Sequence, residues 1–170
     1  MNQTTQQSLS QRRVGPRRTT RSRVAVISSS WHRDVVANGI AAIRAELTRT
    51  SDPPGELDLF EVPGAFEIPL HAKRLAASGA YDAIIACGLV VNGGIYRHEF
   101  VASAVIDGLM RVQLETDIPV FSAVLTPRDF HEHEEHRKFF SEHFVKKGTE
   151  AAQACVETLA SLDKLPGRDG

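Results

Sequence analysis

The chain has 170 residues, 42% of them hydrophobic, which suits one compact domain with a real core. The formal net charge of -1 gives no global field for nucleic acid or an anionic membrane, and we expect neither partner. No apolar run approaches the roughly 20 residues that a membrane-spanning helix needs. Cys87 and Cys155 both lie in apolar segments. We therefore expect two buried free thiols and a reducing, cytoplasmic location.

The first 21 residues differ in composition from the rest of the chain. They are rich in Gln, Ser, Thr and Arg and contain almost no apolar residues. We interpret residues 1–21 as a mobile basic tail, with a nucleic-acid-binding arm as the alternative. A transit peptide is disfavoured because Gly15-Pro16 would interrupt an amphipathic helix. The sequence predicts a single domain over 22–165 and a mobile end over 166–170.

Strand and helix patterns alternate through the first half of this domain. A strand is predicted over 23–27, followed by a helix whose apolar face repeats at helical spacing: Val36, Ile40, Ile43 and Leu47. Residues 51–55 are predicted as a loop, and a second strand over 57–62 is stopped by Pro63-Gly64. The next helix carries Ile68, Ala72 and Leu75, tolerates Pro69 in its first turn and ends at Gly79.

The second half continues the alternation. The apolar run 83–91 is typical of a strand covered on both faces. A helix follows along Val101, Ala104, Val105, Gly108 and Val112, and a fourth strand is predicted over 119–125. Asp129 and Glu132 suggest a capping box for one further helix, and apolar residues from Ala152 to Leu162 indicate a last one. The order β-α-β-α-β-α-β-α-α predicts an α/β fold, a parallel sheet with helices on both faces.

Unusual residues follow each predicted strand. In such sheets, ligands bind beyond the carboxyl ends of the strands. Aromatic, glycine and titratable residues occur at all four places: Ser28 to His32, Pro63 to Glu67, Asn92 to Glu99, and Thr126 to His131. This arrangement indicates a site for a planar, polar ligand.

Each of these residues also has a structural interpretation. Trp31 is either a stacking platform for a ring or a packing aromatic at the base of a loop. Glu67 precedes a helix and could simply favour its dipole. Gly93-Gly94 is either a plain turn or a backbone cradle for an anion, with Arg97 and His98 adding charge.

The histidine-rich run from 131 to 136 does not have zinc-protease spacing. His131 has Glu135, and His133 has Arg137, at the position where a second histidine would be needed. We expect a solvated helix face there and no metal site. Two other fold relatives also fit poorly: serines replace the acidic residues of a receiver domain after the first strand, and Trp31-His32-Arg33 replaces the glycines of a flavodoxin phosphate loop.

Three motifs resemble the lumazine synthase family. Residues 62–69, VPGAFEIP, look like its signature; residues 87–94, CGLVVNGG, leading to His98, match its third-strand loop; Lys147-Gly148 with Glu150 matches the start of its final helix. The resemblance covers residues 23 to about 160. It implies a flavodoxin-like three-layer α/β/α sandwich with a four-stranded parallel sheet. The implied enzyme is a transferase that needs no cofactor.

The resemblance also implies residue roles. Trp31 takes the place of the aromatic that stacks on the pyrimidine, Ala65, Phe66 and Glu67 match the ribityl-binding segment, and Leu89, Val90 and Val91 match the lining of the pyrimidine site. His98 matches the proton donor, and Lys147 and Glu150 match a charged pair that completes the site. Ser122 occupies the place of a residue donated by a neighbouring subunit, which implies homo-pentamers.

The sequence departs from the common pattern in the phosphate half of the site. The loop before His98 is one residue longer than in the commonest members of the family. Within this longer loop, Gly94, Ile95 and Arg97 are the expected phosphate contacts. His136 stands where an arginine usually grips the phosphate, and its loss of charge at high pH should weaken phosphate binding. These departures resemble the second bacterial type of the family, which assembles as decamers of two pentamers.

The implied reaction joins 5-amino-6-(D-ribitylamino)uracil to 3,4-dihydroxy-2-butanone 4-phosphate. An amine attacks a ketone to form an imine, phosphate leaves, an enol tautomerises and the ring closes. Because each step moves protons, a residue that titrates near neutrality is useful, and His98 qualifies. The alternative is a non-catalytic flavin- or lumazine-binding protein, or an assembly protein, on the same fold.

Overall fold

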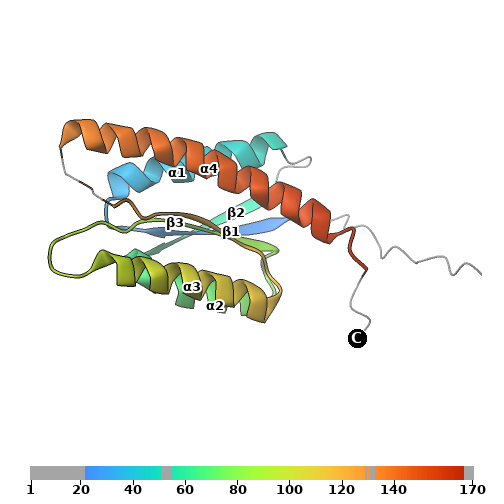
Figure 1. Cartoon of the computed structure of the whole chain (residues 1–170). Coiled ribbons are helices and arrows are strands. Elements are labelled where there is room, and N and C mark those ends of the chain that lie inside the picture. Colours follow the sequence, from blue (N-terminus) through green and yellow to red (C-terminus); the bar gives the residue numbers. More distant parts are fainter. Residues whose placement is uncertain (1–21, 51–54, 129, 131–132, 167–170) are drawn as a thin grey trace, which may run out of the picture.

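A computed structural model describes residues 22–50, 55–128, 130 and 133–166 of the chain (Figure 1). The predicted tail 1–21, most of the loop 51–55, the capping residues Asp129 and Glu132, His131 and residues 167–170 lie outside the described residues.

A four-stranded parallel sheet forms the centre of the molecule. Its strands are β1 (Arg23–Ser29), β2 (Glu56–Val62), β3 (Ala83–Leu89) and β4 (Val120–Leu125). Their spatial order is β2-β1-β3-β4, and every pairing is parallel. Every residue of β3 is buried, which explains why its sequence is an unbroken apolar run.

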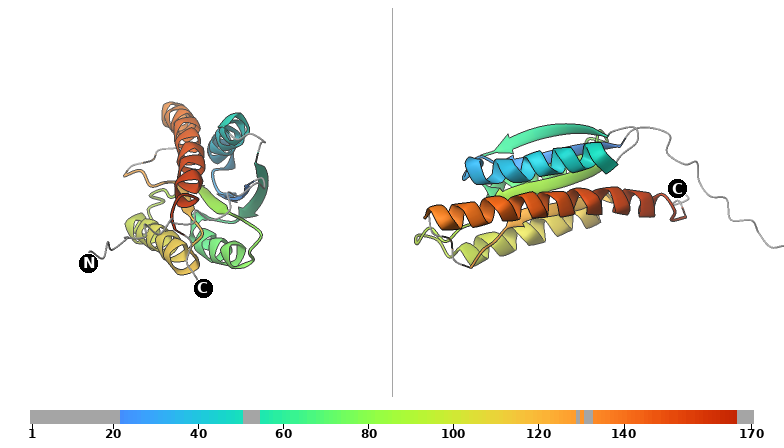
Figure 2. Two further views of the ribbon diagram at one scale, coloured as in Figure 1. Left: turned by 90° about the vertical axis from the view of Figure 1, so that its right-hand side faces the viewer. Right: turned by 90° about the horizontal axis from the view of Figure 1, so that it is seen from above.

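Helices cover both faces of this sheet. α1 (Arg33–Thr50) and α4 (Glu134–Leu162) lie side by side on one face, and α2 (Ile68–Ala77) and α3 (His98–Thr116) lie on the other (Figures 1 and 2). Each face has its own cluster of buried apolar side chains, with Ile43 and Phe144 in one and Ile68 and Val105 in the other. The predicted flavodoxin-like α/β/α sandwich with a four-stranded parallel sheet is confirmed.

The prediction of two helices after the fourth strand is wrong. A single 29-residue helix, α4, runs from Glu134 to Leu162, so Lys147-Gly148 lies in its interior instead of starting it. Gly148 is buried at the crossing with α1, where an added Cβ would lie 2.5 Å from the carbonyl oxygen of Gly39. This glycine permits close helix packing, whereas the sequence alone predicts a helix boundary there.

The strand ends also differ slightly from the prediction. β1 continues through Ser28 and Ser29, which are both buried, and β3 stops at Leu89, two residues before the apolar run ends. Val90 and Val91 therefore belong to the loop beyond the sheet. A short 3₁₀ turn, Ala65–Glu67, connects β2 to α2 after Pro63-Gly64.

Candidate active site

The loops that follow β1, β2 and β3 meet at the carboxyl edge of the sheet, because these strands are adjacent and parallel. Two backbone hydrogen bonds join the first two loops: the N–H of Ser30 donates to the Val62 carbonyl (2.8 Å), and the N–H of Trp31 donates to the Pro63 carbonyl (3.2 Å). The N–H of Val90 donates to Leu125 (2.9 Å) and ties the third loop to the end of β4. The sheet thus fixes where these loops begin.

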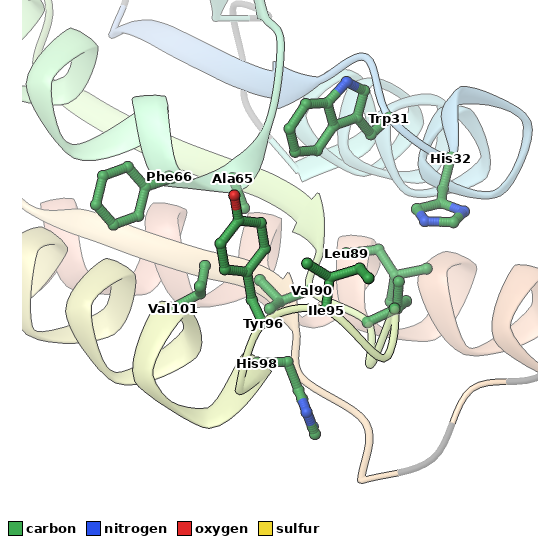
Figure 3. Close-up of a pocket in the computed structure, with 12 residues that line it drawn as sticks. Trp31, His32, Ala65, Phe66, Leu89, Val90, Ile95, Tyr96, His98 and Val101 are labelled. Atoms are coloured by element: carbon green, nitrogen blue, oxygen red, sulfur yellow. The ribbon is translucent and has the colours of Figure 1, made fainter.

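A cavity of about 330 Å³ opens between these loops (Figure 3). Most of its lining is apolar or aromatic, and its rim carries side chains that are largely exposed to solvent. Its lining residues are Trp31, His32, Ala65, Phe66, Leu89, Val90, Val91, Gly93, Ile95, Tyr96, His98 and Val101. A small apolar cavity with few polar groups is the usual form of a ligand site.

Trp31 stands at the entrance of the cavity, with its side chain 64% exposed. The residue after it, His32, has a left-handed backbone (φ 56°), which is uncommon outside glycine. The His32 carbonyl accepts from the N–H groups of Val35 and Val36 and so starts α1. The turn from β1 into α1 therefore leaves the indole ring outside the core.

The segment after β2 supplies a second wall of the cavity. Ala65 is buried beneath it, and Phe66 is 61% exposed on its rim. Glu67 does not line the cavity; its Oε2 accepts a hydrogen bond from the N–H of Gly64 at 2.9 Å. One carboxylate oxygen of Glu67 thus braces the loop before α2, and the match of this residue to the ribityl-binding segment stays a prediction.

His98 is the first residue of α3 and lines the cavity with its side chain 12% exposed. Its Nδ1 lies 3.5 Å from a carboxylate oxygen of Glu99. The pKa of Glu99 is lowered, chiefly by a hydrogen bond from the backbone N–H of Glu99 itself and then by the charges of His98 and Arg97. The helix N-terminus therefore keeps an anionic carboxylate beside this imidazole.

A second, polar pocket of about 220 Å³ adjoins the cavity beside His98. Its lining consists of Asn92, Gly94, Ile95, Tyr96, Arg97, His98 and Glu99. Gly94 has a positive φ of 76°, and its N–H donates to the side chain of Asn92 at 3.1 Å. The Arg97 guanidinium lies 4.6 Å from the centre of the Phe100 ring. The structure thus brings all three predicted loop contacts for phosphate together.

The remaining predicted site residues lie away from the cavity of their own chain. Lys147 and Glu150 are on α4, on the opposite face of the sheet from α2 and α3, and they pair with each other at 2.6 Å. The hydrogen bond from Lys147 is the largest cause that lowers the pKa of Glu150. His136, near the start of the same helix, contacts the ring of Phe140, and Ser122 is exposed on the edge strand β4.

Three residues that line the cavity have no role in the sequence analysis: His32, Tyr96 and Val101. His32 and Tyr96 occur in the loops whose composition indicates the site, so their position after a strand is the available signal. Tyr96 is 79% exposed, and Figure 3 shows its ring between those of Phe66 and Trp31. Val101 has the same helical spacing as the buried residues of α3, so the sequence predicts a core position for it and not a contact with the cavity.

Neither a metal-binding cluster nor a membrane-spanning helix occurs among the described residues. They contain no cluster of three or more His, Cys, Asp or Glu side chains placed to hold a metal ion. Among the helices that the structure describes, none combines the length and the apolar character needed to cross a membrane.

Comparisons with known proteins agree with this geometry. Residues 21–163 match the family model of 6,7-dimethyl-8-ribityllumazine synthase. The protein of that name from Rhodococcus erythropolis is 60% identical over 144 residues, which cover 85% of this chain and 93% of that one.

Proteins named 6,7-dimethyl-8-ribityllumazine synthase 2 are similar as well. The one from Pseudomonas syringae pv. tomato is 54% identical over 143 residues, or 84% of each chain. The one from Bradyrhizobium diazoefficiens is also 54% identical, over 153 residues that cover 90% of this chain and 92% of that one. These matches confirm the predicted resemblance to the second bacterial type: the chain belongs to the 6,7-dimethyl-8-ribityllumazine synthase family.

Proposed function

We propose that the cavity at the carboxyl edge carries out the reaction for which the family is named. It condenses 5-amino-6-(D-ribitylamino)uracil with 3,4-dihydroxy-2-butanone 4-phosphate and releases phosphate and water, as a step of riboflavin biosynthesis. The chain is thus a transferase-type condensing enzyme that acts without a cofactor. The observation that carries the proposal is the convergence of Trp31, the Ala65-Phe66 segment and His98 on one cavity in a chain of this family.

The apolar part of the cavity suits the uracil substrate. Trp31 offers an exposed aromatic ring for the pyrimidine, and Leu89, Val90 and Val91 form the wall beside it. The ribityl chain lies along Ala65 to Glu67, where backbone groups and the second oxygen of Glu67 are within the same loop. The pyrimidine ring of the uracil substrate thus lies against the apolar wall, and its polar ribityl chain lies against the loop after β2.

The polar pocket beside His98 suits the phosphate of the second substrate. Arg97 supplies a positive charge there, and Gly94 and Ile95 place backbone next to it. The α3 N-terminus adds partial positive charge at the same place. The two pockets share Ile95, Tyr96 and His98, so both substrates reach the imidazole.

His98 is the proton-transfer residue of this proposal. Imine formation, phosphate loss and ring closure each move a proton, and an imidazole can both donate and accept one. Holding two substrates against each other in adjoining pockets supplies much of the remaining rate enhancement, because positioning replaces a bimolecular encounter.

A neighbouring copy of the chain completes the site in this proposal. Ser122, His136, Lys147 and Glu150 are at least partly exposed and lie outside the cavity of their own chain, so they are available to the cavity of a neighbour. We infer a homo-pentamer, and from the resemblance to the second bacterial type a decamer of two pentamers. Sedimentation analysis would distinguish a pentamer, a decamer and a larger shell.

The single-domain assignment for residues 22–165 and the cytoplasmic location are also inferences. Two apolar clusters on the faces of one sheet support a single folding unit. The only two cysteines, Cys87 and Cys155, are free and buried, and burial raises the pKa of each thiol to about 12. Such protonated thiols suit a protein that needs no oxidising compartment.

The decisive experiment mixes both substrates with the full-length protein and follows the absorbance and fluorescence of the lumazine product. We expect product formation well above the spontaneous rate. A protein that binds the uracil substrate but does not exceed that rate would instead support the non-catalytic binding function.

A further inference from the structure

Gly64 lies directly against the indole ring of Trp31. A Cβ built on Gly64 would stand 2.7 Å from Cζ3 and 2.8 Å from Cε3 of that ring. Carbon atoms in normal contact are about 3.5–4.0 Å apart, so the ring occupies the space that any other side chain would need. Gly64 has an extended backbone (φ -132°), which every residue can adopt. The glycine is therefore required by the contact and not by its conformation.

The backbone holds Trp31 and Gly64 together. The N–H of Trp31 donates to the carbonyl of Pro63 at 3.2 Å, and the hydroxyl of Ser30 donates to the same carbonyl at 3.1 Å. On the other side, Glu67 accepts from the Gly64 N–H at 2.9 Å. Because both backbone segments are tied at these points, a side chain added at position 64 has to be accommodated by rotation of the indole and not by separation of the two segments. Figure 3 shows the Trp31 ring pointing toward the segment that carries Ala65.

We infer that Gly64 is a positioning residue for substrate binding: its missing side chain sets how far the Trp31 ring stands from the opposite wall of the cavity. This inference rests on the proposed contact between Trp31 and the pyrimidine. Any side chain at position 64 moves the ring into the space that the pyrimidine needs. Gly64 thereby determines the width of the ring that the site accepts, without touching the substrate.

The displacement is large enough to matter. Restoring normal contact distances after adding a Cβ requires a movement of roughly 1 Å, which is enough to make the indole overlap a ring packed against its other face. For the Gly64→Ala variant we expect the KM for the uracil substrate to rise about tenfold. We expect kcat to change by less than about threefold, because His98 and the phosphate pocket are not displaced.

Trp31 is the only tryptophan of the chain, so tryptophan fluorescence, excited at wavelengths that tyrosine does not absorb, reports on this ring alone. In Gly64→Ala, titration with the uracil substrate should show weaker binding, in parallel with the higher KM. A KM and a fluorescence titration within about twofold of wild type would overturn the inference.

A second substitution tests whether the effect passes through the ring. A phenylalanine at position 31 keeps an aromatic face but has no counterpart of the indole atoms Cε3 and Cζ3, which meet the added Cβ. Adding Gly64→Ala to Trp31→Phe should therefore change KM by less than about twofold, and this non-additivity is the signature of direct contact. If Gly64→Ala is equally harmful in the Trp31→Phe background, the added methyl acts elsewhere, for instance on Glu67, and the inference is wrong.

Gly108→Ala is the matched control. Its Cβ would lie 2.9 Å from Pro69 Cβ, so it crowds the contact between α2 and α3 to a similar degree, away from the lining of the cavity. It should lower the free energy of unfolding and leave KM unchanged. A similar rise in KM would attribute the Gly64 effect to general loosening and count against a positioning role.

Two further outcomes distinguish a folding defect of Gly64→Ala from a failure of the proposed contact between Trp31 and the pyrimidine. If Gly64→Ala fails to fold but the double variant folds, the clash with Trp31 is supported; if both fail, it is contradicted. Trp31→Ala tests the proposed pyrimidine contact by itself: an unchanged KM there would refute that contact. A raised KM in Trp31→Ala with an unaffected Gly64→Ala would refute only the role of Gly64.

Discussion

The two edges of the sheet differ in the side chains that they leave exposed to solvent and in those that they bond to one another. At the amino edge, the Arg23 guanidinium and the Tyr81 hydroxyl both donate to one carboxylate oxygen of Asp58, at 2.7 and 2.9 Å. The Arg23 N–H donates to Asp82 at 2.7 Å, and the guanidinium lies 5.1 Å from the centre of the Tyr81 ring. At this edge charged and polar groups are bonded to one another and join the starts of three strands.

The carboxyl edge instead leaves large apolar side chains in solvent. Trp31, Phe66, Ile95 and Tyr96 are each more than half exposed around the cavity. Exposed apolar surface of this kind is unfavourable in isolation and marks a place where a ligand or partner binds. One edge of the sheet therefore stabilises the fold and the other is available for binding. Substitutions at the amino edge should change stability, and substitutions at the carboxyl edge should change kcat or KM.

The largest expected effect is at the carboxyl edge. His98→Ala should lower kcat by about a hundredfold, because general acid–base catalysis contributes a factor of that order. Binding of the uracil substrate, followed by Trp31 fluorescence, and the thermal midpoint should change little. Wild-type turnover would remove His98 from the mechanism, and a large loss of stability would break the division between the two edges.

At the amino edge we expect a smaller effect, on stability and not on catalysis. Tyr81 is buried and its hydroxyl donates to Asp58, so Tyr81→Phe removes one hydrogen bond at nearly constant volume. The free energy of unfolding, measured with urea, should fall by about 1 kcal/mol. Both kcat and KM should stay at their wild-type values, and a change in either would show that the amino edge influences the site.

The smallest effect is a pH dependence at the same edge. Hydrogen bonds from Tyr81 and then from Arg23 lower the pKa of Asp58 below its ordinary value of 3.8. The stabilisation from this carboxylate is therefore complete above that value and is lost as the pH falls through the lower pKa of the folded state.

The difference in urea midpoint between wild type and Asp58→Asn should accordingly be largest near pH 6 and shrink below about pH 4. Tyr81→Phe should narrow it as well, because one of the two donors is gone. A difference that stays constant from pH 6 to pH 3 would mean that the Asp58 charge does not contribute to stability.

Much of this protein was determined by its sequence alone. Apolar periodicity placed the strands and the first three helices to within a few residues, because burial on a sheet face and on a helix face imposes different spacings. The topology followed, since parallel strands require right-handed crossovers. The position of the site at the carboxyl edge follows from the topology, and the residues of the three loops after β1, β2 and β3 indicate a site for a planar, polar ligand.

Only the tertiary structure decided what depends on contacts between distant segments. Gly148 suggests a helix boundary from sequence, yet it lies inside α4, at a point where α1 passes so close that a side chain would not fit. Gly64 belonged to a recognised motif, but its contact with Trp31, 33 residues earlier, is visible only in three dimensions. The sequence also could not show that Lys147 and Glu150 lie on the far face of the sheet from α3. Spacing along a chain specifies which face of an element is buried, whereas the close approach of two backbones is set by packing between elements.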